Sequence, residues 1–399
     1  MFDRSRRNPY RPGAATTPLH LAGRELQITR FRSVLAGAPE IPANVRLTGL
    51  RGVGKSVLLR ELEEQAASAK WAVVRKQLEP RHNTERGLMD VISALCEASI
   101  RRMSTLRAIK GAVSDAWLAA RGLVNVTIED VTFSLAGESS SEVELAEALY
   151  RATEAAVRSG RAGFAILFDE AQVIADENAR NGEHPLSMLI AAINALQERG
   201  LPVALVLCGL PTLRRNLQRA RTYSERMFRA EHIGPLSGNP GPARDAFVIP
   251  LETTGMRADD DLITRVLAEV EGYPFFIQLW GAQLWEVASD AGDEVLTVTH
   301  LNAIESRIYE RLDEEFYSGR VDALTPSEQD VILASGRCPY PPLRTSDLRE
   351  FSDKSQGNLN VLMGRLSDQG VIYRIQKGQY EYTAPKFADY LHRRLATQP

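Results

Sequence analysis

Two short runs in the chain are apolar at every position, Phe164–Phe168 and Val203–Leu207. Continuous apolar runs of this length are typical of parallel strands that are buried on both faces of a sheet. Val45–Leu50 and Trp71–Leu78 are two further strand candidates. Segments with the apolar spacing of helices, among them 143–159, lie between these runs. Strands that alternate with helices predict an α/β fold with a parallel sheet.

The last part of the chain has a different order of elements. Three short helices are followed by two strands: the helices over 324–336, 345–351 and 357–369, and the strands over 371–375 and 379–383. Thr325-Pro326-Ser327-Glu328 supplies a capping residue, a helix-starting proline and an acid for the first of these helices. Lys377-Gly378 marks the turn between the two strands. Three helices followed by such a hairpin predict a winged-helix domain.

The pattern predicts four parts of the chain. Residues 1–36 form an extended arm and a first helix, and residues 37–239 contain the predicted sheet. Residues 240–320 are almost wholly helical in pattern, and residues 321–399 form the predicted winged helix. Two β-like runs within 123–135 are interpreted as a hairpin in a surface insertion.

Composition and charge limit the ligands and the cellular compartment expected for this fold. The chain has 399 residues, with 48 lysines and arginines against 51 aspartates and glutamates, so any contact with nucleic acid would come from a local patch. The three cysteines are far apart and the six histidines show no metal-ligand spacing, which fits a reducing cytosol. No apolar run reaches the ~20 residues of a membrane span, and the N-terminus lacks a secretory apolar region. We therefore expect a cytoplasmic protein with no membrane partner.

One octapeptide carries the strongest chemical signal in the chain. Gly49-Leu50-Arg51-Gly52-Val53-Gly54-Lys55-Ser56 matches the pattern G-x-x-x-x-G-K-[ST], in which glycines let backbone N–H groups wrap a phosphate. It lies between a predicted strand and an amphipathic helix, whose N-terminus adds positive charge. Lys55 would bridge the β- and γ-phosphates, and the Ser56 hydroxyl would ligate Mg²⁺. With Val57, the next residue, this segment is the expected ATP-binding loop.

An acidic pair follows one of the two apolar strands. Asp169-Glu170 comes directly after Phe164–Phe168, at the carboxyl end of the strand, where α/β sheets place their ligands. Asp169 is the candidate ligand on the magnesium side. Glu170 is the candidate base that orients the attacking water. Gln172, just after, is either a secondary polar contact or solvated surface.

Several of these segments resemble the core of an AAA+ ATPase. GLRGVGKS (49–56), LFDEAQ (167–172) and LVLCGLP (205–211) are similar to the initiator-type branch, the origin-recognition ATPases, and to its prokaryotic relatives near the signal-transducing STAND ATPases. The likeness covers roughly residues 8–320. It implies a P-loop core with a parallel sheet, a helical lid, a bound ATP with Mg²⁺, and ATP hydrolysis.

The resemblance also implies further site residues. LAGRE (21–25) is similar to the GRE box of that branch, which places Gly23, Arg24 and Glu25 beside the adenine. Arg226, with Arg229 as the alternative, falls where the branch carries an arginine finger, which commonly acts on a neighbouring subunit. Pro274, in Glu271-Gly272-Tyr273-Pro274, resembles the lid motif of STAND-like ATPases that approaches the nucleotide.

This sequence departs from the family pattern at two sensor positions. Cys208-Gly209 stands where a polar residue usually senses the γ-phosphate. In addition, no arginine begins the helix after Pro274. Both departures leave the sensing of the terminal phosphate without an assigned residue.

Two functions fit the predicted winged helix. As a reader of double-stranded DNA it would place its third helix in the major groove, with these candidate contacts: Lys354, Asn358, Asn360 and Arg365 on or near that helix, and Arg374 and Lys377 on the wing. As a protein-interaction module it would serve a STAND-like signalling or scaffold ATPase. We expect a nucleotide-dependent switch that binds ATP or ADP and contacts DNA, with protein partners as the alternative. If Arg226 is an arginine finger, it also implies that the protein forms a homo-oligomer.

Overall fold

The computed structural model describes residues 7–13, 16–110, 140–176, 182–221, 224–237 and 241–397. The chain divides into two compact units. The sheet unit consists of Glu25–Thr48 and Leu58–His232. The helical unit consists of Met1–Arg24, Gly49–Val57 and Ile233–Pro399. The division does not follow chain order, because the phosphate loop Gly49–Val57 groups with the later residues. The expected hairpin at 123–135 lies outside the described residues.

The sheet unit is built on five parallel strands in the order β2-β3-β4-β1-β5. The strands are β1 (Ala43–Thr48), β2 (Trp71–Gln77), β3 (Gly163–Asp169), β4 (Val203–Gly209) and β5 (Arg229–His232). β3 and β4 are buried at every residue, as their continuous apolar sequences predict. The parallel α/β sheet is therefore confirmed.

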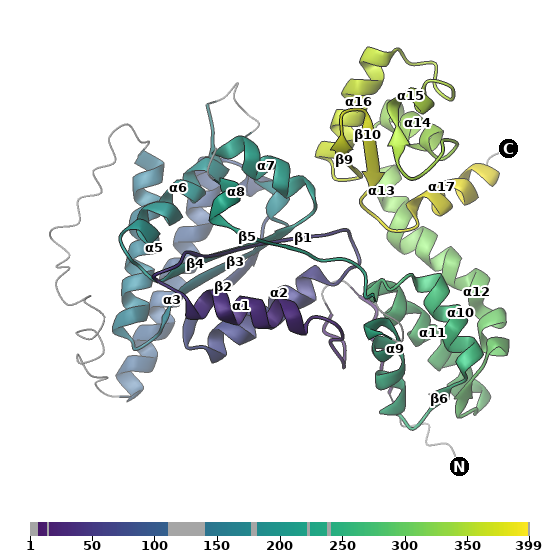
Figure 1. Ribbon diagram of the computed structural model, residues 1–399, viewed down its shortest axis with the longest axis horizontal. Coiled ribbons are helices and arrows are strands. Elements are labelled where there is room, and N and C mark those ends of the chain that lie inside the picture. Colours follow the sequence, from purple (N-terminus) through teal and green to yellow (C-terminus); the bar gives the residue numbers. More distant parts are fainter. Residues whose placement is uncertain are drawn as a thin grey trace. The chain divides into compact units, whose positions relative to one another are not determined.

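Helices cover both faces of this sheet (Figure 1). They are α1 (Glu25–Ala36), α2 (Lys55–Ser68, of which Lys55–Val57 belong to the helical unit), η1 (Pro80–His82), α3 (Glu85–Lys110), α5 (Ser140–Arg158), η3 (Ala171–Val173), α6 (Pro185–Glu198), α7 (Thr212–Ala220) and α8 (Ser224–Met227). One hydrophobic core joins α3, α5 and α6 to alternate residues of the central strands, including Phe164 and Leu205. Helices α1 and α2 lie on the opposite face (Figure 1).

The helical unit contains a cluster of helices around Trp280, which is buried together with Trp285. Its elements up to residue 322 are α9 (Pro242–Glu252), β6 (Arg257–Ala258), α10 (Asp260–Val270), α11 (Pro274–Ala291), β7 (Val295–Leu296), α12 (Val298–Leu312), the π-helical η4 (Asp313–Ser318) and α13 (Gly319–Asp322). The N-terminal arm is anchored here, because Tyr10 is buried and its hydroxyl donates a hydrogen bond to the carbonyl oxygen of Phe247 over 2.5 Å.

The same unit ends with small helices and an antiparallel sheet in the order β8-β10-β9. Its elements are α14 (Pro326–Ser335), β8 (Leu343–Arg344), α15 (Thr345–Leu348), α16 (Gln356–Asp368), β9 (Ile372–Gln376), β10 (Gln379–Tyr382) and α17 (Phe387–Ala396). Thr325 and Glu328 form the predicted capping box of α14, and Gly378 turns the β9–β10 hairpin with φ +77°. The three helices and the hairpin thus occur where the pattern predicts them. One continuous core joins this region to α9–α13.

None of the helices within the described ranges combines the length and apolar character that a membrane crossing needs.

Candidate functional site

The phosphate loop follows β1 and leads into α2, as the sequence predicts. Gly52 and Gly54 have φ values of +79° and +85°, a region that residues with a Cβ enter only with strain. Lys55 is buried, and its Nζ donates a hydrogen bond to the carbonyl oxygen of Leu50 over 2.8 Å. Ser56 and Val57 continue the first turn of α2. The Lys55 ammonium group is therefore bound by a carbonyl group of the loop itself.

Residues far away in sequence bind the carbonyl groups of this loop. Arg24 is buried, and its Nη2 donates to the carbonyl oxygens of Val53 (2.9 Å) and Gly234 (2.7 Å). The backbone N–H of Phe275 donates to the carbonyl oxygen of Gly52 over 3.2 Å. Because these carbonyl groups have partners in the helical unit, the loop is shaped by that unit. The family resemblance predicts only that Arg24 lies near the adenine. It does not predict the hydrogen bond of Arg24 to the phosphate loop.

Pro274 is the first residue of α11, as predicted, and its ring lies against the loop. A Cβ on Gly54 would meet the Pro274 ring at 3.8 Å, which is ordinary van der Waals contact. Proline has no N–H, so it suits a first helical position where that donor would lack a partner. The structure therefore brings Pro274 beside the phosphate loop, and its approach to a nucleotide stays a prediction.

Two guanidinium groups of the helical unit lie close to one another beside the loop. The Cζ of Arg320 stands 4.3 Å from the centre of the Phe316 ring, and Phe316 would lie 4.0 Å from a Cβ on Gly52. Burial, and then the positive charge of Arg51, lower the pKa of Arg320 to about 10. The Nε of Arg51 is buried without a hydrogen-bond partner. Neither side chain forms an ion pair with a carboxylate among the described residues.

These features fit an anionic ligand with several phosphates. The loop offers an unpartnered buried donor on Arg51, a buried lysine, and glycines in the conformation that exposes backbone N–H groups. A buried pair of like charges is unfavourable until an anion is bound. Within the described ranges, no group of three or more His, Cys, Asp or Glu side chains could hold a metal alone. Oxygen ligands from Ser56, a carboxylate and the phosphates are the set that Mg²⁺ prefers.

The acidic pair lies in the sheet unit at the carboxyl end of β3. Asp169 is buried, and its Oδ1 accepts a hydrogen bond from the backbone N–H of Glu170 over 2.9 Å. Glu170 is half-buried and has φ +53°, ψ +34°, the left-handed region. The strands β1, β3 and β4 are parallel, so their carboxyl ends share one edge of the sheet. The loop starts directly after β1, and the acids stand at the end of β3.

Gln172 connects the end of β3 to the end of β4. Its Nε2 donates to Glu170 Oε2 over 2.5 Å, and its Oε1 accepts from the backbone N–H of Leu210 over 3.0 Å. Cys208, one residue before the end of β4, is buried. The sequence alone does not identify these hydrogen-bond partners of Gln172.

Arg226 and Arg229 occupy different surroundings. Arg226 is exposed in the last turn of α8. Arg229 begins β5, and its Nε lies 3.4 Å from Glu231 Oε1. The exposed position keeps Arg226 as the candidate finger, and its action on a neighbouring copy stays a prediction.

The candidate DNA contacts are mostly on the surface. Asn358, Asn360 and Arg365 are exposed on α16, and Arg374 and Lys377 are exposed on the β9–β10 hairpin. Lys354 differs, because its Nζ is 3.1 Å from Asp330 Oδ2. Among the described residues, neither Arg365 nor Lys377 forms an ion pair with a carboxylate, although the charge of Arg365 contributes to lowering the pKa of Glu328.

Comparisons with known proteins agree with this architecture. Residues 20–207 match the sequence profile of an AAA ATPase domain, and residues 314–391 match that of a domain of unknown function. No curated protein sequence matches the chain. The Walker-type ATPase PABY2304 of Pyrococcus abyssi has a similar structure, with a TM-score of 0.55 and 17% identity over 96% of this chain and 98% of that one. The ORC2 protein of Aeropyrum pernix, solved as ADPNP-ADP complexes, has a TM-score of 0.52 and 11% identity over 96% and 97%.

At such identities the likeness shows the fold alone. Together, the sheet order and the likeness to these structures establish an α/β fold with a parallel sheet, shared with P-loop ATPases, and residues 20–207 are similar to an AAA ATPase domain.

Proposed function

We propose that the protein is a Mg²⁺-dependent ATPase that acts as a nucleotide-dependent switch. Lys55 and the backbone of the phosphate loop would bind the phosphates, with Arg51 adding charge. Ser56 and Asp169 would hold Mg²⁺, which neutralises phosphate charge when bound. Glu170 would orient the attacking water and accept its proton.

One hydrogen bond carries the proposal of a switch. The backbone N–H of Arg51, in the phosphate loop, donates to the carbonyl oxygen of Thr383 over 2.9 Å. Thr383 directly follows β10, so the loop is bonded to the end of the hairpin sheet. A phosphate that reshapes the loop would strengthen or break this bond. Nucleotide binding would thereby bias the position of the C-terminal region.

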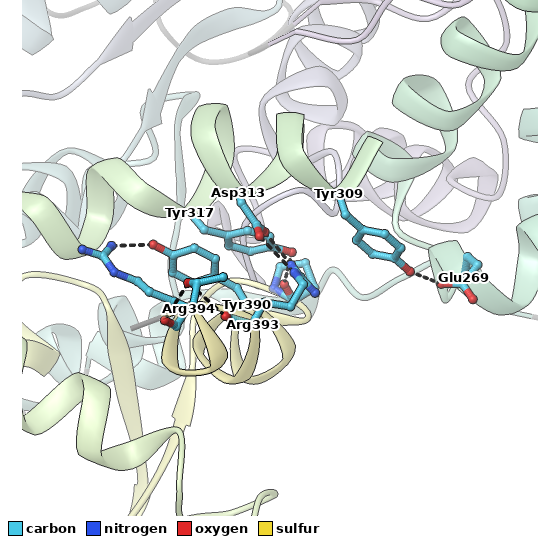
Figure 2. A network of polar contacts seen from close by, with 9 residues as sticks. Glu269, Tyr309, Asp313, Tyr317, Tyr390, Arg393 and Arg394 are labelled. Carbon is cyan, nitrogen blue, oxygen red and sulfur yellow. Dashed lines mark hydrogen bonds and ion pairs between the residues drawn. The ribbon is translucent and has the colours of Figure 1, made fainter. Parts of the chain in front are cut away.

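A network of side chains links that region to the helices before it (Figure 2). Arg393 on α17 bonds to both carboxylate oxygens of Asp313, at 2.9 and 2.5 Å. Next to it, Arg394 donates to the Tyr390 hydroxyl over 2.6 Å, and Tyr317 donates to the carbonyl oxygen of Pro385 over 2.8 Å. This network and the shared core support movement of α9–α17 as one body.

Steady-state hydrolysis and nucleotide affinity test the ATPase. Lys55→Ala should weaken ATP binding by about 10- to 100-fold, because it removes a charge-assisted contact to the phosphates. Glu170→Gln should leave ATP affinity near that of the wild type and reduce turnover by about 100-fold or more. Arg311→Ala, an exposed change on α12, is the control. Unchanged affinity in Lys55→Ala would reject the binding site, and unchanged turnover in Glu170→Gln would reject the assigned base.

We further propose that residues 321–399 act as a winged helix that binds double-stranded DNA. The supporting observation is that Arg365, on α16, and Lys377, on the hairpin, are exposed cations that form no ion pair with a carboxylate in the described structure. Exposed Asn358 and Asn360 add amide groups that can read base edges. The polar face of α16 and the tip of the hairpin would then contact the same duplex.

Fluorescence anisotropy with a labelled duplex tests this assignment. Protein loaded with ATP and protein loaded with ADP should differ in affinity, and both affinities should fall steeply as salt is raised. Absence of binding in both states would reject DNA as the ligand. The C-terminal region would then be a protein-binding module, as in the STAND-like alternative, and the contact between Arg51 and Thr383 would regulate that partner instead.

Arg226 extends the proposal to an assembly. An exposed arginine at the end of α8 suits a group that stabilises phosphate charge in a neighbouring copy. ATP-dependent oligomerisation, followed by light scattering, with loss of turnover but not of ATP binding in Arg226→Ala, would support it. Turnover that is independent of protein concentration would reject it.

A further inference from the structure

Gln172 is held at both ends by groups of the sheet unit. Its carboxamide donates to Glu170 Oε2 and accepts from the N–H of Leu210, the residue after β4. Its backbone is fixed from α7, because Asn216 Nδ2 donates to the carbonyl oxygens of Gln172 (3.0 Å) and Ile174 (3.2 Å). A side chain anchored in this way has little freedom to move relative to β3 and β4.

The acid that Gln172 contacts has an unusual backbone. Glu170 has φ +53°, a value that is uncommon in residues with a Cβ and is retained only when the surroundings impose it. The left-handed turn aims the Glu170 side chain back toward Gln172, two residues later. The hydrogen bond occupies Oε2, and within the described part of the chain no group donates to Oε1, which is available to a water molecule.

The end of β4 is shaped to admit the carboxamide. A Cβ on Gly209 would lie 2.3 Å from Gln172 Oε1 and 3.1 Å from the backbone N of Gln172. Any larger residue at 209 would therefore displace the carboxamide. This explains in steric terms why β4 ends in glycine, since the space beside it is taken by the Gln172 carboxamide from η3, which follows the neighbouring strand β3.

We infer that Gln172 is a positioning residue that fixes the direction of the Glu170 carboxylate and couples it to the end of β4. The inference rests on the proposed function, because it assigns Glu170 the role of orienting water. A carboxylate held by a charge-assisted hydrogen bond presents its second oxygen in one direction, which is what water activation requires. Gln172 itself does not touch the reacting atoms.

The first test replaces Gln172 by methionine, which keeps the length of the side chain and removes both hydrogen bonds. We expect kcat to fall by about tenfold through loss of orientation, with ATP affinity and KM within about twofold of the wild type. In a Glu170→Gln background the same change should have no further effect on residual turnover, because no carboxylate remains to be aimed.

Gln197→Met is the matched control. Gln197 is also half-buried in the sheet unit, and its Nε2 donates to Asn44 Oδ1 and to the carbonyl oxygen of Val203, both at 2.9 Å. Val203 begins β4, at the opposite edge of the sheet from Gly209. Loss of these bonds should lower the melting temperature and leave kcat unchanged. This comparison separates orientation of Glu170 from general loosening of β4.

The second test does not depend on turnover. Gly209→Ala should lower the melting temperature in the wild type, because the new methyl group meets Gln172 Oε1. In a Gln172→Ala background the loss should shrink by about half, since the backbone contacts to Gln172 N at 3.1 Å and Ala171 N at 3.4 Å remain. Equal losses in the two backgrounds would overturn the steric link between Gly209 and Gln172.

The outcomes distinguish this inference from the proposed function. If Glu170→Gln abolishes turnover while Gln172→Met retains full kcat, the positioning role is wrong and the ATPase stands. A rise in kcat in Gln172→Met also overturns it, because the carboxamide would then restrain the acid. If Glu170→Gln leaves turnover unchanged, the assigned base is wrong and the inference fails with it.

Discussion

Phe275 donates its backbone N–H to the carbonyl oxygen of Gly52, so the second residue of α11 is bonded to the middle of the phosphate loop. The first N–H groups of a helix have no partner within the helix. Here one of them is satisfied by the loop, and Pro274, before it, has no N–H to satisfy. The start of α11 and the conformation of the loop therefore depend on each other.

Gly52→Ala should damage both stability and nucleotide binding. Residue 52 has φ +79°, and a Cβ would lie 3.4 Å from Phe275 Cβ. We expect a loss of about 1 to 2 kcal/mol in the free energy of unfolding, measured with urea, and weaker ATP binding. Gly200→Ala is the control, because it has φ +74° with open space around it. It should show a similar loss of stability with unchanged ATP affinity, and equal effects on affinity would contradict the role of Gly52.

Arg320→Met should stabilise the free protein and weaken its binding of polyphosphate. Because the pKa of Arg320 falls on folding from its ordinary value to about 10, the unfolded chain holds the proton more tightly. The charge is therefore unfavourable to folding throughout the range below pH 10, and the unfavourable contribution fades as pH rises above 10. Methionine keeps the packing on Phe316 without the charge.

We expect a gain of about 1 kcal/mol in the free energy of unfolding at pH 7.5, from urea denaturation. Inorganic tripolyphosphate should bind about tenfold more weakly, by calorimetry. The exposed Arg311→Met, whose Nε pairs with Glu315 at 2.9 Å, should do neither. A less stable Arg320→Met protein with full tripolyphosphate affinity would refute the role of this cation.

The pair Asp313–Arg393 should couple the π-helical turn to α17. A double-mutant cycle with Asp313→Asn and Arg393→Met should give a coupling of about 1 to 2 kcal/mol, since the contact is bidentate and half-buried. The exposed pair Arg311–Glu315 should give about 0.4 kcal/mol. The cycle is measured by urea unfolding, and equal couplings for the two pairs would show that Figure 2 depicts contacts of little energetic weight.

Arg365→Ala and Lys354→Ala should differ in their effect on duplex DNA. Arg365 is exposed and forms no ion pair with a carboxylate in the described structure, whereas Lys354 pairs with Asp330. We expect Arg365→Ala to weaken binding by about tenfold and to reduce the salt slope by about 1, whereas Lys354→Ala changes affinity by about twofold or less. Anisotropy titrations at several salt concentrations measure both. A larger effect at Lys354 would place the duplex on another surface.

The central strands and the phosphate loop could be predicted because their signals are local. Phe164–Phe168 and Val203–Leu207 are apolar throughout, and only a strand covered on both faces explains such runs. β5 gave no such signal. Its residues, Arg229–His232, are mostly exposed and charged, and it pairs with β1 on one side only. Its strand conformation comes from that neighbour and not from its own pattern.

The partners of the site residues could not be predicted, because they depend on tertiary contacts. Arg24 bonds to Gly234 and Arg51 to Thr383, across separations that no motif encodes. Gln172 follows the acidic pair by two residues, yet its second partner, Leu210, lies on another strand's end. The glycine at position 209 was the one hint in the sequence, because a glycine where a polar sensor is usual indicates that another group occupies the space of its side chain.

The phosphate loop takes its shape from residues outside the segment that identifies it. The AAA ATPase profile ends at residue 207, whereas Gly234, Phe275 and Thr383 supply a neighbouring carbonyl, a donor and an acceptor around the loop. A fragment cut to the limits of the profile would contain every residue of the nucleotide-binding motif but few of the groups that fix the conformation of the loop. Such a fragment also lacks β5 and should bind ATP poorly, so the smallest piece with full affinity should extend past the end of β10 to include Thr383.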